Sequence, residues 1–139
     1  EYLVRAAKNR RVCMNESREN YLKTLFILTR EKYPKPVRAV DIANRLGISR
    51  ASVSRAMSVL REEGYVCCDH GRALILSDIG RQIAQTICER QDVLHRFLRE
   101  CIQIEGETAR MDACKVEHAI SEETYEGIKR FLQTYSEKG

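Results

Sequence analysis

The sequence lacks any apolar run that approaches the roughly 20 residues a membrane-spanning helix needs, and its N-terminus lacks the apolar core of a signal peptide. It also has no internal repeat and no low-complexity tract. Its six cysteines follow neither the regular spacing of a secreted disulfide scaffold nor the CxxC pairs of a zinc ribbon. These absences predict a soluble, cytoplasmic protein with free thiols and no membrane partner.

Sequence signatures of common enzymes are missing as well. The chain has no HExxH helix, no nucleophile elbow and no glycine-rich phosphate loop. A small metallohydrolase that uses Glu117 as a base beside His118 is therefore the least favoured interpretation of the chain. We expect the protein not to be an enzyme.

Charge of the two signs is present but unevenly divided. The net charge of the 139 residues is +4, yet residues 1–76 carry 15 Lys and Arg against 8 Asp and Glu, while residues 77–139 carry 9 against 12. A basic half suits the neutralisation of DNA phosphates, and an acidic half suits a different task. The length allows one domain with a single hydrophobic core, or a smaller domain followed by a helical subdomain. Two parts with two functions are therefore expected.

Residues 40–65 have the pattern of two helices joined by a tight turn. Gly47 ends the first helix, because only glycine takes a positive φ without steric cost, and Ser49 can cap the second. Apolar residues recur at helical spacing on both sides of the turn, with Ile42, Ala43 and Leu46 before it and Val53, Met57 and Leu60 after it. The pattern predicts a helix-turn-helix.

The second helix of this pair has a polar, positive face that need not be buried. Such a face suits a helix in the DNA major groove, where arginine can pair with guanine and hydroxyl groups can reach phosphates. The alternative is an ordinary two-helix corner with a solvated basic face. The residues expected to contact DNA are Ser49, Arg50, Ala51, Ser52, Ser54, Arg55 and, from the hairpin that follows, Arg72.

That hairpin favours DNA binding over the ordinary corner. Gly64 ends the second helix, and the β-prone runs 65–69 and 73–76 flank the turn 70–72. A hairpin directly after a recognition helix is a wing, and Arg72 at its tip would lie near the DNA backbone or minor groove. The N-terminal half is therefore predicted to be a winged helix-turn-helix domain that binds a double-stranded operator.

Helices are expected on both sides of this domain, which makes the fold mainly α. A helix over 17–31 precedes it, with Ser17 as its cap, and three helices follow at 78–101, 108–120 and 122–135. The last of them is expected to face inward with Tyr125, Ile128, Phe131 and Leu132. Ser77 can cap the long helix, whose apolar face includes one polar residue, Gln91. Such a helix commonly serves dimerisation, although it can also pack only within its own chain. Residues 1–13 receive no function, and Met14 is a candidate natural start.

A cluster of possible metal ligands lies in the predicted helix 108–120. Cys114, Glu117 and His118 stand at i, i+3 and i+4, so a thiolate, a carboxylate and an imidazole share one helical face. A thiolate with an imidazole suits Fe²⁺ or Zn²⁺ better than Mn²⁺. On the pattern alone, three polar residues on one face of an amphipathic helix are more often simply solvated.

Several motifs together resemble one family, the iron- and manganese-dependent repressors related to the diphtheria toxin repressor and the manganese transport regulator. The likeness spans about residues 16–132. It is carried by Tyr21-Leu-Lys-Thr24, Asp41-Ile-Ala43, Ser52-Val-Ser54, Leu76-Ser-Asp-Ile-Gly80 and, most specifically, Cys114-Lys-Val-Glu-His-Ala-Ile-Ser121. The resemblance implies a homodimeric transcriptional repressor of metal homeostasis genes, with a divalent transition metal as corepressor. It implies a DNA-binding domain over 14–76 and a helical metal-binding and dimerisation domain over 77–139.

The resemblance also implies further ligand positions at which this sequence departs from the family. Asn20 and Lys23 stand at the first-helix positions, and a basic residue there, together with Cys114, resembles the iron branch. Gln91 stands where a histidine of an ancillary metal site is usual in the family. The other positions of that site would be His95 and Arg110, and an arginine cannot ligate a metal. Asn20, Gln91 and His95 are the additional metal-ligand candidates. The alternative is a winged-helix regulator that has lost metal control or responds to thiol oxidation, for example at Cys67 or Cys114.

Overall fold

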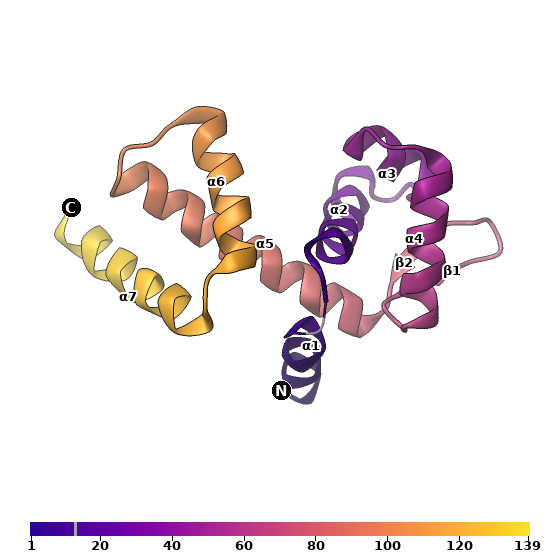
Figure 1. Cartoon of the computed structure of the whole chain (residues 1–139), viewed down its shortest axis with the longest axis horizontal. Helices are drawn as coiled ribbons and strands as arrows, with labels where there is room; N and C mark the ends of the chain where they lie inside the picture. Colours follow the sequence, from indigo (N-terminus) through magenta and orange to yellow (C-terminus); the bar gives the residue numbers. More distant parts are fainter. Residues whose placement is uncertain (13) are drawn as a thin grey trace. The chain divides into compact units, whose positions relative to one another are not determined.

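The computed structural model describes residues 1–12 and 14–139, and the chain is mainly helical (Figure 1). It divides into two compact units, Glu1–Thr86 and Ile87–Gly139. The elements in chain order are α1 (Tyr2–Val12), α2 (Glu16–Lys32), α3 (Ala39–Leu46), α4 (Arg50–Glu62), β1 (Val66–Cys68), β2 (Leu74–Leu76), α5 (Asp78–Glu100), α6 (Gly106–Ala119) and α7 (Glu122–Lys138). None of the helices in the described part of the chain is long and apolar enough to cross a membrane.

Residues 2–12, for which the sequence predicted no element, form α1. Arg10 donates to the carbonyl of Glu63 at 3.3 Å, and its guanidinium lies over the ring of Tyr65, 5.7 Å from the ring centre. Arg11 is ion-paired with Glu19 through two contacts of 3.0 and 3.3 Å. Because the partners of Arg10 lie 53 and 55 positions away, no local pattern reveals that α1 is anchored to the N-terminal unit.

The N-cap of α2 lies two residues before the cap that the sequence suggested. Asn15, and not Ser17, is the N-cap, since its side-chain oxygen accepts from the backbone N–H of Arg18 at 2.9 Å. The prediction of the Ser17 cap was therefore wrong, because two adequate capping residues stand close together and packing selects between them. The helix buries Leu22, Leu25 and Leu28 in the core of the N-terminal unit.

The helix-turn-helix forms as predicted. Gly47 has φ of 66°, and the backbone N–H of Ile48 donates to the carbonyl of Ala43 at 3.1 Å, which closes the end of α3. Ser49 caps α4 by accepting from the N–H of Ser52 at 3.1 Å. The predicted apolar stripe of α4 is buried, with Val53, Met57 and Leu60 at most 3% exposed. Helices α2, α3 and α4 pack on one another.

The start of α3 depends on one carboxylate. Asp41 Oδ2 accepts from the backbone N–H of Arg38 at 2.8 Å and lies 2.7 Å from Lys32 Nζ. The Lys32 ammonium and the Arg38 amide lower the pKa of the Asp41 carboxyl, and partial burial opposes them weakly. A lowered pKa in the folded state means that this carboxylate stabilises the fold above its unfolded pKa, and that the contribution disappears as pH falls through the folded value.

The substitution Asp41→Asn should therefore lower the free energy of unfolding near neutral pH by about 1 kcal/mol, the usual size of a lost helix cap. The difference between variant and wild type should shrink as the pH falls below about 4, where the wild-type carboxyl becomes protonated as well. Urea unfolding followed by circular dichroism at several pH values measures both effects. A difference that stays constant down to pH ~2 would contradict the assigned role of the charge.

The wing is a two-stranded antiparallel sheet. Its register pairs Val66 with Leu76, Cys67 with Ile75, and Cys68 with Leu74. Asp69 shapes the turn, because its side chain accepts from the N–H groups of Gly71 and Ala73 at 2.9 and 2.8 Å. Both Cys67 and Cys68 are exposed. Strand β1 buries only Val66 and then leaves the core for the turn.

The C-terminal unit consists of the later turns of α5 with α6 and α7. Its core contains Ile87, Leu94, Ala109, Ala113, Tyr125 and Leu132. Ser121 caps α7 by accepting from Thr124 N–H at 3.1 Å. Phe131, which was expected to face inward, is 52% exposed, because it lies at the edge of this core, edge-on to Phe97 and stacked on Tyr135.

Candidate DNA-binding face and metal-ligand cluster

The residues that the sequence assigned to DNA contact lie on α4, at its N-cap and in the turn of the wing. Six of the seven are exposed, and Ser52 is half-buried because it also joins the cap. The full set is Ser49, Arg50, Ala51, Ser52, Ser54, Arg55 and Arg72. Arg55 also donates to the Ser52 hydroxyl at 3.3 Å, which orients its guanidinium along the first turns of α4. Exposed donors at the start of a helix suit base edges in a major groove.

A basic groove lies between α4 and the wing. Its volume is about 420 Å³, and it is lined by Arg50, Ser54 and Arg61 of α4, by Cys68 and Arg72 of the wing, and by Arg38 before α3, among others. Four guanidinium groups around one groove create a positive potential that suits the phosphates of a DNA backbone. Sequence patterns missed Arg38, because a residue before a helix has no periodicity that assigns it to a face.

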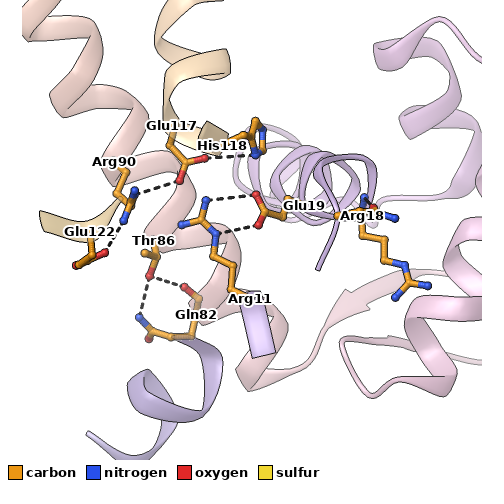
Figure 2. Close-up of polar contacts among 10 residues, drawn as sticks. Arg11, Arg18, Glu19, Gln82, Thr86, Arg90, Glu117, His118 and Glu122 are labelled. Atoms are coloured by element: carbon orange, nitrogen blue, oxygen red, sulfur yellow. Dashed lines mark hydrogen bonds and ion pairs between the residues drawn. The ribbon is translucent and has the colours of Figure 1, made fainter. Parts of the chain in front are cut away.

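The C-terminal unit brings together two of the three metal-ligand candidates on α6. Glu117 Oε2 and His118 Nδ1 lie 3.5 Å apart, and the Glu117 side chain is buried (Figure 2). Two ligands bound tetrahedrally at about 2.1 Å stand roughly 3.4 Å apart, so this pair fits one edge of such a site. Cys114 is half-buried one helical turn before His118. The structure thus brings a carboxylate and an imidazole of α6 close together.

A guanidinium occupies the other side of the Glu117 carboxylate. Arg90 Nε of α5 lies 3.2 Å from Glu117 Oε1, and its Nη1 lies 2.6 Å from Glu122 Oε2 of α7 (Figure 2). Its guanidinium also lies over the ring of Tyr125, with the carbon 4.5 Å from the ring centre. Burial raises the pKa of the Tyr125 phenol, and the positive charge of Arg90 opposes that shift. Arg90 thus joins α5, α6 and α7 in one polar network.

The remaining metal-ligand candidates are placed as follows. Gln91 and His95 are half-buried one turn apart on α5, in the same unit as Glu117. Arg110, expected at the ancillary site, is ion-paired with Glu107 at 3.6 Å on an exposed surface. Asn20 is half-buried on α2 and belongs to the N-terminal unit. Arg90 and Glu122 were missed by the sequence analysis, since three-helix contacts leave no signal in local spacing.

The fold and the two sites define a class of protein: a winged helix-turn-helix DNA-binding domain followed by a helical domain with candidate metal ligands. Two family models match, the iron-dependent repressor N-terminal DNA-binding domain over residues 14–74 and the iron-dependent repressor metal-binding and dimerisation domain over residues 77–138. The chain belongs to the iron-dependent repressor family. The likeness recognised in the sequence motifs is thereby confirmed.

Known proteins agree with this assignment. The transcriptional regulator MntR of Escherichia coli is 32% identical over 120 residues, which is 86% of this chain and 76% of MntR. An uncharacterised HTH-type transcriptional regulator of Methanocaldococcus jannaschii is 29% identical over 125 residues, with 90% of this chain and 99% of that protein covered. A solved manganese-dependent transcriptional repressor in complex with manganese superposes with a TM-score of 0.71 at 29% identity, covering 84% of this chain and 52% of its own. The chain thus spans about half the length of that structure.

Proposed function

We propose that this protein is a metal-responsive DNA-binding transcriptional repressor, with a divalent transition metal as its corepressor. The observation that carries the proposal is the 3.5 Å pair of Glu117 and His118 in a chain whose α4 presents an exposed basic face. Membership of the iron-dependent repressor family, and relatives named transcriptional regulators, support the same function. No enzymatic activity is part of this proposal. The proposed DNA partner supports a location in the compartment that holds the DNA, which we propose to be the cytoplasm.

The proposed division of labour follows the family models. Residues 14–76 would bind DNA, and residues 77–139 would bind metal and dimerise, although the compact units divide ten residues later, within α5. A homodimer would present two copies of α4 to two half-sites of one operator. The exposed aromatic edge of α7 around Phe131 is available to such a contact.

Cys114, Glu117 and His118 would hold the metal, with Asn20, Gln91 and His95 as weaker candidates. A bound ion would supply the positive charge that holds the donors of Cys114, Glu117 and His118 together. An ion that binds the DNA-competent arrangement more tightly than the inactive one favours it by that difference in affinity alone. The thiolate and imidazole in this set suit Fe²⁺ or Zn²⁺ better than Mn²⁺.

The second candidate is a regulator that responds to thiol oxidation or has lost metal control. It is favoured by the exposure of Cys67 and Cys68 in the wing and by the place of Cys68 in the basic groove. Modification of a thiol in that groove would obstruct DNA directly. Operator affinity that changes with oxidant but not with chelator would support this candidate.

The proposed function is tested by titrating the purified, metal-free full chain with Fe²⁺, Zn²⁺ and Mn²⁺. Elemental analysis measures bound metal, and fluorescence anisotropy with a promoter fragment selected from genomic DNA measures binding. The proposal expects one metal per chain at saturation and a tightening of DNA binding over the same concentration range. DNA affinity that is identical with metal and with chelator would overturn it.

Within this function, two arginines should have different effects on DNA binding. Arg55→Ala should relax sequence preference at one base position, at a cost of about 1–3 kcal/mol there, because its exposed guanidinium is placed to pair with a base. Arg72→Ala should weaken all sequences alike and reduce the salt slope of log K by about 1, because a wing residue contacts phosphate.

Binding of the selected fragment and of a scrambled duplex at several salt concentrations separates these two effects. Arg45→Ala is a matched control, since Arg45 is ion-paired with Glu31 and is not part of the groove. If Arg55→Ala leaves the sequence preference of DNA binding intact, α4 does not lie in the DNA major groove as proposed.

A further inference from the structure

Arg90 uses one of the two oxygens of the carboxylate that the proposed metal would need. Its Nε lies 3.2 Å from Glu117 Oε1, while the other oxygen, Oε2, faces His118 Nδ1 at 3.5 Å. The two oxygens of Glu117 are therefore divided between a permanent cation on α5 and the imidazole on α6. The guanidinium of Arg90 does not lose its charge in a protein.

The position of Arg90 is strongly constrained. Its side chain is 9% exposed, its second carboxylate partner is Glu122 at 2.6 Å, and its planar guanidinium packs on the ring of Tyr125. These partners lie on α6 and α7 of the same unit, so the guanidinium that extends from α5 is held by contacts with both of these helices. A group held in this way orients its partner rather than following it.

We propose that Arg90 is a metal-selectivity residue that acts by positioning Glu117. With Oε1 held by Arg90, Glu117 can offer a metal only one oxygen, and the adjacent positive charge reduces the net negative charge of the site. Cys114, one oxygen of Glu117 and His118 would then be the donors, a thiolate, a carboxylate oxygen and an imidazole that suit Fe²⁺, Co²⁺ or Zn²⁺. Mn²⁺ prefers oxygen ligands, and it would lack the second oxygen of Glu117 and part of the negative charge of the site. The inference rests on the proposed function, because it assumes that Glu117 is a ligand.

The test compares Mn²⁺ with Co²⁺, which also reports its own geometry through its visible absorption. Dissociation constants for both ions are measured on the full chain by competition with a chromophoric chelator. Arg90→Gln should strengthen Mn²⁺ binding relative to Co²⁺ binding by about tenfold, in the range typical of residues that orient metal ligands. The absorption of the Co²⁺ complex should weaken, as expected when a tetrahedral site gains a ligand. Arg90→Lys, which keeps the charge, should stay close to the wild-type ratio.

Glu122→Gln provides a second test with the opposite sign. This substitution removes the second carboxylate that pairs with Arg90, so the guanidinium should pair more strongly with Glu117. Mn²⁺ binding should then weaken relative to Co²⁺ binding. The side chain of Glu122 is 47% exposed, which makes the change mild for folding. Arg96→Gln is the matched control, because Arg96 lies on the same helix in an exposed ion pair with Glu100 and should leave the ratio unchanged.

The results separate this inference from the function on which it rests. A wild-type chain that binds neither ion overturns the proposed metal response, and the selectivity role with it. If the wild type binds Co²⁺, and the folded Arg90→Gln variant has the same ratio of Mn²⁺ to Co²⁺ dissociation constants as the wild type, the selectivity role alone is overturned. If Arg90→Gln loses its helical circular dichroism, Glu122→Gln decides, and an unchanged ratio in that variant is equally adverse.

Discussion

The double variant Cys114→Ala/His118→Ala is expected to lose all metal-stimulated DNA binding. These substitutions remove the thiolate and the imidazole of the proposed site, and the single carboxylate that remains cannot hold a divalent ion tightly. An allosteric effector typically changes affinity by about 5- to 150-fold, so a gain of that size in the wild type should be absent from the variant. Anisotropy of labelled operator DNA, with saturating metal and with chelator, measures it.

A control on the same helix distinguishes loss of ligands from damage to α6. Met111→Ala/Lys115→Ala replaces two exposed side chains of α6 and should keep the full metal response. Weak DNA binding in chelator should be the same for both variants and for the wild type, because the winged domain is unchanged. A metal response that survives in Cys114→Ala/His118→Ala would mean that the ligands lie elsewhere.

Gly80→Ala is expected to destabilise the N-terminal unit by about 3 kcal/mol, at the upper end of the usual cost of overpacking a core. A Cβ at this position would overlap the carbonyl oxygen of Tyr65 and lie 3.1 Å from its carbonyl carbon. That carbonyl is fixed, since it accepts from the backbone N–H of Ser77 at 3.0 Å. Neither the wing nor the first turn of α5 can move away without losing this hydrogen bond. Urea unfolding monitored by circular dichroism gives the free energy.

The matched control is Gly127→Ala on α7. A Cβ there would lie 3.8 Å from the Arg130 guanidinium, which is ordinary contact with a flexible side chain. Because alanine favours a helix over glycine, this variant should gain up to about 1 kcal/mol. The same chemical change should therefore have opposite signs in the two units. Equal effects of the two substitutions would show that Gly80 is not closely packed against Tyr65.

Local features of the winged domain could be predicted because each depends on neighbours in sequence. Gly47 ends α3, Ser49 caps α4, and the buried stripe of α4 follows from spacing alone. The cap of α2 could not be predicted, since Asn15 and Ser17 are both suitable and only packing separates them. The inward orientation of Phe131 was also wrong, because helical spacing gives a direction but not the extent of the core.

Residue order along the chain was enough to predict α2 to α7, the wing and the shared helical face of Cys114, Glu117 and His118, since backbone preferences and helical repeat act over a few residues. The environment of those side chains depended on folding. Arg90 reaches Glu117 and Glu122 over 27 and 32 positions, and Arg38 joins Arg61 and Arg72 around one groove. Such contacts form only when distant helices pack, because electrostatic partners are selected by distance in space and not by separation in the chain.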